Sequence, residues 1–450
     1  MLDVGRHPNI VLMAYSEVES VRGEAPKFRV TVRKKARYVD EEKCTGCGAC
    51  REKCPTVVPD MFNMGLGGRK AIYSWFAQGI PSTHTIDPKY CRQLNGKKCG
   101  ICKKTCPAGA IDFEQKDSLL EIQVGAIIVA TGYSPFDPSV IPEYGYGKVP
   151  NVITSLEFER LLSASGPTEG HLYRPSEIMA KRELPKIERE FKRLNKALER
   201  FEKSNNIDSE RYYRENRSKL DRLNKQGREW IEKYERFMEL NERIEQLKES
   251  AEQHKIAKRL AFVQCVGSRD KRFYPFCSSY CCMHSIKEAI IAHEHEPDTR
   301  STIFGMDIRA VGKGFEEYKL RGADQSHIRY VRGRVGEIIE GKGKNPVVVY
   351  EDTNERKVKR EEFDLVILAT ACVPSEGTKR LSEVLGVELT NFGFFKTKAG
   401  SPLDTTREGI FVCGCAHSPM DIPESVAQAS GAASRAVQFI ISHTKKRAAA

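Results

Sequence analysis

Eight of the fifteen cysteines fall in two runs whose spacing suits iron–sulfur chemistry. The runs are Cys44-x2-Cys47-x2-Cys50-x3-Cys54-Pro55 and Cys91-x7-Cys99-x2-Cys102-x3-Cys106-Pro107. Two-residue gaps let successive thiolates converge on one side of a tight loop, and the cysteine before proline turns toward the opposite cluster. The sequence therefore predicts two crossed cluster sites: Cys44, Cys47, Cys50 and Cys106 hold one, and Cys91, Cys99, Cys102 and Cys54 hold the other.

Zinc sites and disulfides are the competing interpretations of these runs. Zinc ribbons use paired C-x2-C knuckles and do not need the second gap or the C-x3-C-P ending. Disulfides are disfavoured because the N-terminus has no apolar segment typical of a secretory signal, and reduced thiols are the cytosolic default. We expect Gly46, Gly48 and Gly100 to supply the positive φ angles that such cluster loops need. The same reasoning predicts a cytoplasmic protein.

Four more thiols, Cys265, Cys277, Cys281 and Cys282, lie close together in the sequence. The surrounding pattern predicts strand, loop, helix and strand, which is where a dinucleotide-binding unit places its glycine-rich phosphate loop. No G-x-G-x-x-G is present here, so we infer that a cluster site replaces a nucleotide site. Buried free cysteines on the helix are the alternative, because the adjacent Cys281 and Cys282 need a bent loop to point the same way.

Length, charge and hydropathy limit the domain count and the classes of function that the chain can have. A chain of 450 residues predicts about two to three domains. The net charge of +12 does not indicate nucleic-acid binding, because basic and acidic residues are interspersed rather than gathered in a stripe. No run of apolar residues is long enough to predict a membrane span.

Three apolar strands end in small residues, which is typical of a doubly wound α/β fold. They are predicted in the runs Gly125 to Tyr133, Phe363 to Pro374 and Gly409 to Ala416. Ala130-Thr131-Gly132 ends the first strand in the manner of flavoproteins with two dinucleotide domains. A helix beginning near Pro423 is expected to present free amides and a positive dipole to a flavin. An ordinary α/β core is the alternative.

The chain outside these strands divides into further segments. Strands are predicted in residues 1–40, at Asn9 to Tyr15 and Lys27 to Lys34. Residues 177–258 carry apolar positions spaced three and four apart within a highly charged stretch, which predicts an antiparallel coiled-coil hairpin with Leu220 and Leu223 in its second helix. The hairpin is either a docking arm for a partner subunit or a solvated insertion.

These residues resemble the A subunit of heterodisulfide reductase. The resemblance rests on Cys-Val-Gly-Ser-Arg-Asp from Cys265, Cys-Ser-x-x-Cys-Cys-Met from Cys277, the run from Tyr38 to Cys50, the run from Pro150 to Thr168, and the run from Asp421 to Ser430. It implies an α/β fold: a thioredoxin-reductase-like flavoprotein core with an incomplete FAD domain, an inserted α+β ferredoxin domain and the helical hairpin.

The resemblance also implies domain boundaries. Residues 1–40 form strands of the flavoprotein core, 41–114 a ferredoxin domain with two 4Fe–4S clusters, and 115–176 a further core segment. Residues 177–258 form the hairpin, 259–375 a degenerate second nucleotide-binding domain with a third 4Fe–4S cluster, and 376–450 a C-terminal FAD-binding segment.

Cofactors and site residues follow from the same resemblance: three 4Fe–4S clusters and FAD. The third cluster is held by Cys265, Cys277, Cys281 and Cys282, and the FAD contacts are Thr131, Gly132, Gly414, Cys415, Asp421, Ile422 and Val426. Lys287 lies just over one helical turn beyond Cys282, so its ammonium is a catalytic candidate that stabilises a reduced flavin; a surface lysine is the equal alternative. Of the remaining cysteines, Cys372 and Cys413 are expected to be core thiols.

The sequence departs from the family in its FAD-binding half. The nearest approaches to G-x-G-x-x-G fail at the sixth position, where Gly65-Leu-Gly67 is followed by Lys70, Gly145-Tyr-Gly147 by Pro150 and Gly312-Lys-Gly314 by Glu317. No cysteine follows Cys415, so the family's C-terminal ferredoxin is not found either. We therefore expect either a split gene whose partner chain completes the FAD site or a truncated product.

The expected function is that of an oxidoreductase subunit. An iron–sulfur flavoprotein would bifurcate or confurcate electrons between a two-electron donor, a heterodisulfide (CoM-S-S-CoB)-type acceptor of methanogenesis and ferredoxin. Its partners would be B- and C-type subunits, a hydrogenase or formate dehydrogenase input subunit, ferredoxin and the chain that completes the FAD site. The alternatives are a flavin-free iron–sulfur relay and a docking subunit of a redox complex.

Overall fold

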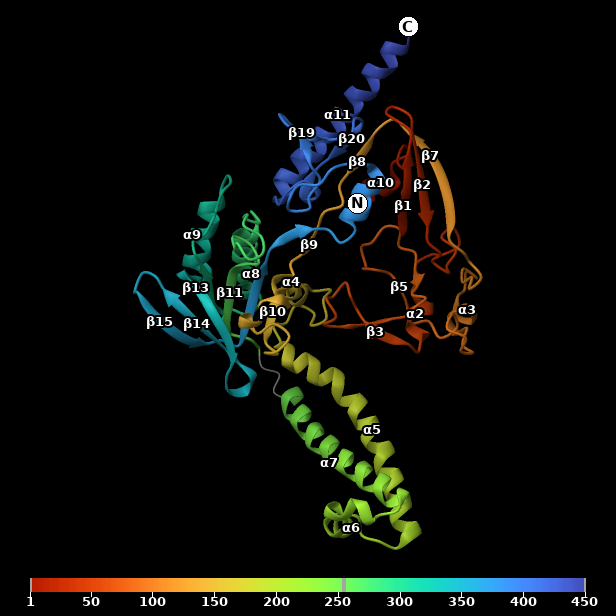
Figure 1. Cartoon of the computed structure of the whole chain (residues 1–450), viewed down its shortest axis with the longest axis vertical. Coiled ribbons are helices and arrows are strands. Elements are labelled where there is room, and N and C mark those ends of the chain that lie inside the picture. Colours follow the sequence, from red (N-terminus) through yellow and green to blue (C-terminus); the bar gives the residue numbers. More distant parts are fainter. Residues whose placement is uncertain (1, 253–255, 449–450) are drawn as a thin grey trace.

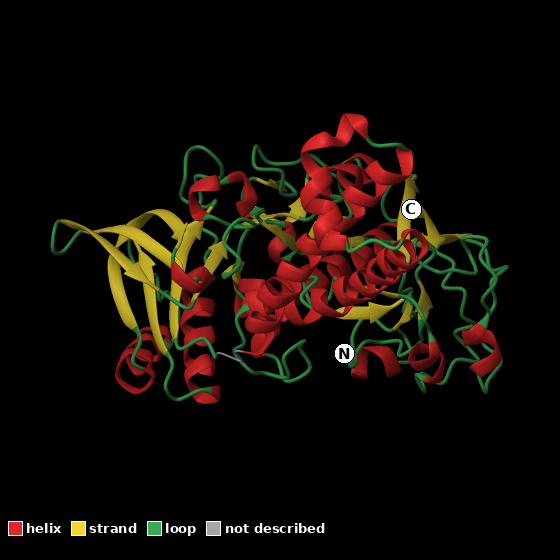
Figure 2. Cartoon of the chain, turned by 90° about the horizontal axis from the view of Figure 1, so that it is seen from below, coloured by secondary structure: helices red, strands yellow, loops and turns green. Residues whose placement is uncertain are grey.

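A computed structural model describes residues 2–252 and 256–448 of the chain (Figure 1). The remaining positions, which belong to the predicted segments 1–40, 177–258 and 376–450, lie outside the described residues. Two sheet-containing parts face each other, the loops with the two cysteine runs lie beside one of them, and a helical arm projects from the other (Figure 1). Seen from below, helices crowd the middle of the molecule while strands lie toward both ends (Figure 2).

A seven-stranded sheet forms the larger part, in the order β10-β16-β11-β12-β13-β14-β15. Its strands are β10 (Val152–Thr154), β11 (Arg259–Val266), β12 (Arg300–Gly305), β13 (Arg329–Glu340), β14 (Pro346–Asp352), β15 (Lys357–Glu362) and β16 (Leu365–Thr370). β10, β16, β11, β12 and β13 pair in parallel, and β13 to β15 form an antiparallel meander. Its helices are α4 (Ser155–Leu162), α8 (Cys281–His295) and α9 (Phe315–Ser326).

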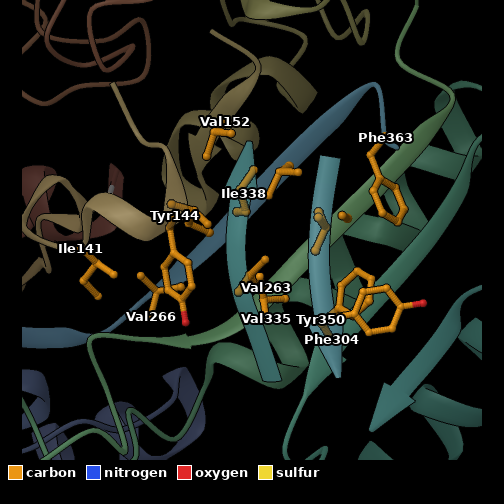
Figure 3. Packing of buried hydrophobic residues seen from close by; sticks show 14 of the residues in the cluster. Ile141, Tyr144, Val152, Val263, Val266, Phe304, Val335, Ile338, Tyr350 and Phe363 are labelled. Atoms are coloured by element: carbon orange, nitrogen blue, oxygen red, sulfur yellow. The ribbon is translucent and has the colours of Figure 1, made fainter. Parts of the chain in front are cut away.

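The apolar runs explain the central strands of this sheet. Every residue of β16 is buried, as is expected of a parallel strand covered on both faces. One face packs with the meander, where Phe304, Tyr350 and Phe363 meet (Figure 3). The other face packs on α4 and α8, where Phe158 and Ile286 are fully buried. The sequence order β11, loop, α8 and β12 confirms the predicted strand–loop–helix–strand unit.

The second part contains a four-stranded and a three-stranded sheet. The four-stranded sheet has the order β18-β19-β20-β8 and the three-stranded sheet the order β1-β2-β7. Their elements are β1 (Ser16–Arg22), β2 (Phe28–Lys34), β7 (Ser118–Val124), β8 (Ile127–Val129), β18 (Thr397–Lys398), β19 (Ser401–Thr405), β20 (Ile410–Val412), η5 (Gly414–Ala416), α10 (Thr378–Leu385) and α11 (Ile422–Ala448). Phe28, Val129 and Val412 share one core between the sheets.

A short ladder connects the two parts. β9 (Tyr133–Pro135) follows β8 and pairs antiparallel with β17 (Cys372–Pro374), which follows β16. The chain therefore crosses between the parts twice at one place, directly after the predicted strand ends. Short helical turns, η1 (Pro138–Val140), η2 (Pro142–Tyr144) and η4 (Lys342–Lys344), and the N-terminal helix α1 (Leu2–Arg6) complete these parts.

The cysteine-rich loops contain little regular structure. They carry α2 (Ala49–Lys53), α3 (Ile101–Thr105), β3 (Val57–Pro59), β4 (Gly68–Lys70), β5 (Ile72–Tyr73) and β6 (Thr85–Ile86). Val39, Ile72, Ile86 and Ile111 form their small core, together with cysteine side chains.

The helical arm consists of α5 (Pro175–Asn205), α6 (Ser209–Asn216), η3 (Arg217–Arg222) and α7 (Lys225–Glu252). α5 and α7 pack side by side and antiparallel, since Arg236 pairs with Glu190 and Arg243 with Glu183. The base of the arm is tied to the sheet because Arg174 donates a hydrogen bond to Asn345 at 2.9 Å.

Two predicted elements are wrong. Asn9 to Tyr15 is not a strand: Val11 is 80% exposed, and the strand that pairs with β2 is β1, whose Val18 and Val21 lie opposite Val32 and Val30. In the arm, Leu220 and Leu223 lie in the connection before α7, because α6 and η3 separate the two long helices. The predicted α/β class is confirmed by the sheets and helices. None of the described helices combines the length and apolar composition needed to cross a membrane.

Candidate functional site

The two short helices α2 and α3 position the ferredoxin-type cysteines. Gly48 precedes α2 with φ of 82° and Gly100 precedes α3 with φ of 77°, which confirms the predicted positive φ angles; Gly46 has φ of 72°. Each helix carries one cysteine inside it and ends at another, Cys54 or Cys106, in extended conformation. The extended ending turns the last thiol of each run away from its own loop.

Two small cavities are lined by these thiols. One is lined by Cys44, Cys47, Cys50 and Cys106. The other is lined by Cys54, Cys91, Cys99 and Cys102. Both groupings coincide with the predicted crossed ligand sets. The amide of Ala110 donates to Cys106 Sγ at 3.4 Å, a backbone hydrogen bond of the kind that supports cluster ligands.

Burial raises the pKa of two of these thiols, Cys50 and Cys102, in the metal-free chain. Burial raises the pKa of Cys50 to about 11. Three neighbouring cysteines add to this increase, and the Arg51 amide opposes it. Burial and the nearby Cys91 raise the pKa of Cys102 to about 12. Thiolates packed this closely need a positive partner, and metal ions supply it when they displace the protons.

His84 is a residue of this site that sequence reasoning missed. Its ring lines the cavity of Cys44 and Cys106 and is only 3% exposed. Neither ring nitrogen has a hydrogen-bond partner within residues 2–252 and 256–448. Such a buried polar group needs a partner, and the sulfur atoms of a cluster in the cavity fit that need. No motif marks His84, because its contacts come from residues distant in sequence.

No three His, Cys, Asp or Glu side chains in the described chain lie close enough to share one metal ion. Soft thiolates in groups of four are the donor set that iron–sulfur clusters use. The thiol donors and the small cavities therefore suit iron–sulfur clusters rather than mononuclear sites.

The third cysteine group assembles around the end of β11 and the start of α8. Cys265 adopts φ of 62° where the pairing of β11 with β16 is irregular. Cys281 and Cys282 are the first two residues of α8, and both are buried. Burial raises the pKa of Cys281, and the charges of Cys265, Cys282 and Cys277 raise it further, so the four thiols are mutual neighbours.

A cavity of about 1180 Å³ lies beside this group, between the two sheet-containing parts. Cys277 is in its wall, and so are five of the seven candidate FAD residues. Those five are Gly132, Gly414, Cys415, Asp421 and Ile422. Thr131 and Val426 do not line it, although Val426 is 60% exposed on α11. The cavity brings together segments that lie far apart in the sequence.

The start of α11 offers fewer amides than the sequence suggested. The Asp421 carboxylate accepts a hydrogen bond from the Glu424 amide at 2.9 Å, and Pro423 has no amide hydrogen. The Ser425 amide donates to the Asp421 carbonyl at 3.0 Å. Because Asp421 caps the helix, backbone amides that were expected to face a flavin are already hydrogen-bonded.

α8 contributes charged residues to the cavity. Lys287 is exposed and lines it, one turn beyond Cys282, and His284 and Glu288 line it as well. His284 Nδ1 lies 3.3 Å from Glu288 Oε1. Burial raises the pKa of Glu288, and His284 opposes that increase. The His284–Glu288 pair had no sequence signal beyond its spacing of one helical turn.

Comparison with known proteins finds similarity to one domain family and to several longer proteins. Residues 37–60 match the family described as 4Fe-4S binding domain. The A subunit of the H(2):CoB-CoM heterodisulfide,ferredoxin reductase of Methanothermobacter marburgensis is 38% identical over 97% of this chain and 54% of its own length. An iron-sulfur A subunit of the CoB–CoM heterodisulfide reductase of Methanopyrus kandleri is 41% identical over 97% of this chain and 55% of its own.

Similarity to solved structures is more limited. Thioredoxin reductase of Lactococcus lactis matches with a TM-score of 0.30 and 19% identity, covering 41% of this chain and 54% of that one. Thioredoxin reductase of T. acidophilum matches with a TM-score of 0.29 over 42% of this chain and 53% of that one.

These two sequence relatives align with 97% of this chain. The chain spans about half the length of the curated relatives it matches. Over about half of their length, heterodisulfide reductase A subunits are similar to this chain at 37–41% identity.

Proposed function

We propose that the chain is an iron–sulfur and FAD oxidoreductase subunit of a heterodisulfide-reductase-like complex. It carries three 4Fe–4S clusters, and its FAD bifurcates or confurcates electrons between a two-electron donor, a heterodisulfide-type acceptor and ferredoxin. The observation that carries the proposal is the common cavity: Cys277 of the third cysteine group and five candidate FAD residues line the same wall.

The cluster assignment is supported by the donor set. Twelve cysteines form three groups of four neighbouring thiols, and two of these groups surround separate small cavities. A cubane needs four thiolates and no water ligand, so each group meets the requirement without a further side chain. Cytoplasmic location remains part of the proposal, since cytosolic conditions keep such thiols reduced.

FAD fits the large cavity in size and lining. Drug-sized ligands occupy cavities of about 300–1,000 Å³, and this one measures about 1180 Å³. Gly132 and Gly414 have φ of 69° and 65°, which leaves backbone without side-chain bulk at the wall. When bound, FAD exchanges electron pairs with two-electron donors and single electrons with clusters. The Lys287 ammonium at the wall would then stabilise negative charge on the reduced ring.

The FAD phosphates need a second chain in this proposal. This sequence contains no G-x-G-x-x-G, and the Asp421 cap occupies an amide at the start of α11. A partner with a glycine-rich phosphate loop and a free helix N-terminus would supply the missing contacts.

Other partners follow from the names of the relatives. Those names include H(2), formate and ferredoxin. We therefore propose a hydrogenase or formate dehydrogenase subunit as the electron-input partner of this chain, and ferredoxin as a further partner. B- and C-type subunits complete the complex. The α5–α7 arm is a docking element in this view, since its aromatic core around Trp230 is internal and leaves its charged faces exposed.

The test is anaerobic purification of the chain alone and together with the products of neighbouring genes, followed by flavin quantitation. FAD bound to the complex and lost from the isolated chain is the expected result. Iron–sulfur clusters without flavin in every complex would instead indicate an iron–sulfur relay. Gly414→Val provides the matched variant: it should lower the flavin content of the complex and leave its iron content unchanged.

A further inference from the structure

Two cysteines outside the cluster groups lie against each other at the junction of the two sheet-containing parts. Cys372 begins β17 and Cys415 is in η5, and these two elements are in contact. Their thiols lie close enough that each shifts the pKa of the other. Sequence reasoning took Cys372 for a core thiol and Cys415 for a flavin contact, so neither residue has been assigned thiol chemistry.

Cys415 is the accessible member of the pair. It is half-buried and lines the large cavity, so small molecules entering the cavity reach its sulfur. The neighbouring Cys372 thiol outweighs burial, and with the Met420 backbone and Ser425 it lowers the pKa of Cys415 to about 6. Cys415 is therefore the member of the pair that ionises more readily, and the thiolate is the reactive form of cysteine.

Cys372 lies behind it. Its side chain is 0% exposed, and its amide donates to Ser278 Oγ at 2.9 Å. The hydroxyl of Tyr280 also lies near the Cys372 thiol. These contacts hold a protonated thiol beside the Cys415 sulfur and out of reach of solvent. An accessible, half-buried thiolate backed by a second thiol is the arrangement of redox-responsive cysteines.

We propose that Cys415 and Cys372 form a reversible disulfide when a hydroperoxide enters the large cavity. The Cys415 thiolate attacks one oxygen of the peroxide, and the O–O bond breaks. The Cys415 sulfur is thereby oxidised to the sulfenic acid, and the leaving oxygen takes one proton from solvent and departs as water. Cys372 then attacks the sulfenic sulfur, the S–S bond forms, and a second water leaves with the Cys372 proton. Hydrogen peroxide is the two-electron oxidant, and a dithiol reverses the reaction by disulfide exchange.

The bond would connect the two parts of the fold covalently. β17 continues from β16 of the seven-stranded sheet, and η5 follows β20 of the four-stranded sheet. Oxidation therefore fixes the junction beside β9 and removes the Cys415 thiolate from the cavity wall. The reaction itself needs no cofactor, because both thiols belong to this chain.

The test treats the anaerobically purified, iron-loaded chain with increasing amounts of hydrogen peroxide. Free thiols are alkylated, the chain is digested, and linked peptides are identified by mass spectrometry. The expected product is a peptide pair joined through Cys372 and Cys415, which forms before iron is lost and disappears with dithiothreitol. A pair that forms only after iron loss, or a Cys415 that stays free, would overturn the proposal.

Three variants sharpen the result. Cys415→Ser should lose the linked pair, and Cys372→Ser should accumulate a Cys415 sulfenic acid that dimedone traps. Cys413→Ser is the matched control, because this buried thiol donates to the Val129 carbonyl instead, and the linked pair should persist. A pair that needs Cys413 contradicts the assignment.

A measurement on the unsubstituted chain does not depend on any variant. The rate of Cys415 alkylation should reach half its maximum near pH 6, since only the thiolate reacts. A half-maximum at about 8.5, the value of an ordinary cysteine, would refute the activated thiol.

Discussion

Replacing His84 with phenylalanine should lower the reduction potential of one cluster and leave the others unchanged. His84 lines the cavity of Cys44, Cys47, Cys50 and Cys106, and both of its ring nitrogens lack a partner among the described residues. With a cluster in that cavity, a ring N–H donates to a sulfur atom. A donor stabilises the reduced, more negative cluster, so its removal favours the oxidised form. Phenylalanine keeps the ring and loses the donor.

The size of the effect follows from the hydrogen bond. A hydrogen bond to a charged group contributes about 1.5–3 kcal/mol. For one electron, a tenfold change in equilibrium constant, about 1.4 kcal/mol, corresponds to about 59 mV. Only the part of this bond that strengthens on reduction shifts the potential, so the potential should fall by at most about 60–130 mV. Burial supports the larger part of that range, since the ring is only 3% exposed and water cannot replace the lost donor.

The assay is a redox titration of the purified chain monitored by electron paramagnetic resonance. The cluster of Cys54, Cys91, Cys99 and Cys102 serves as the internal reference, because His84 does not line its cavity. Thr83→Val is the matched control: Thr83 is also buried and adjacent, but it does not line either cavity. Equal potentials in His84→Phe and the unsubstituted chain would refute the hydrogen bond, and a fall in both clusters would point to a general disturbance.

Four further perturbations test the cluster sites, the pH dependence of stability and the helical arm separately. Cys281→Ser should reduce the iron content from about twelve to about eight atoms per chain; unchanged iron would show that the third group holds no cluster. Cys102→Ala should remove the cluster of Cys54 and Cys91 while the third group keeps its iron, and loss of all iron would refute independent modules. In the metal-free chain the pKa of Cys50 is raised from 9.0 to about 11, so the stability it contributes is present below pH 9 and lost by pH 11. The melting temperature of that form should fall across this window, while the iron-loaded chain, whose thiolates are ligated, should not follow. Replacing residues 186–246 of the arm with a short linker should abolish partner binding and preserve iron, because its core is internal; retained binding would exclude docking through the arm.

Local sequence patterns were sufficient to predict the backbone geometry of the ferredoxin-type loops. The glycines before α2 and α3 adopt the predicted positive φ, and the cysteine after each helix points toward the opposite cavity. Spacing determines this geometry because each loop is only a few residues long. The strand–loop–helix–strand unit around Cys265 and Cys281 was likewise predicted, since apolar runs identify buried strands.

Local sequence patterns did not predict the contacts between segments that lie far apart in the sequence. His84 has no motif, and the Cys372–Cys415 pair exists only because β17 and η5 meet between two sheets. Apolar composition also misled: the run from Asn9 to Tyr15 is largely exposed, whereas the charged β1 pairs with β2. Pairing partners, rather than hydrophobicity, decided which segment became the strand.

Iron and sulfide quantitation with Mössbauer spectroscopy on the anaerobically purified chain tests whether its twelve cysteines hold three cubanes. We expect about twelve irons and about twelve sulfides per chain, all in 4Fe–4S clusters. About eight irons would contradict the third site, and mononuclear iron or zinc in the same sites would contradict the cluster assignment itself.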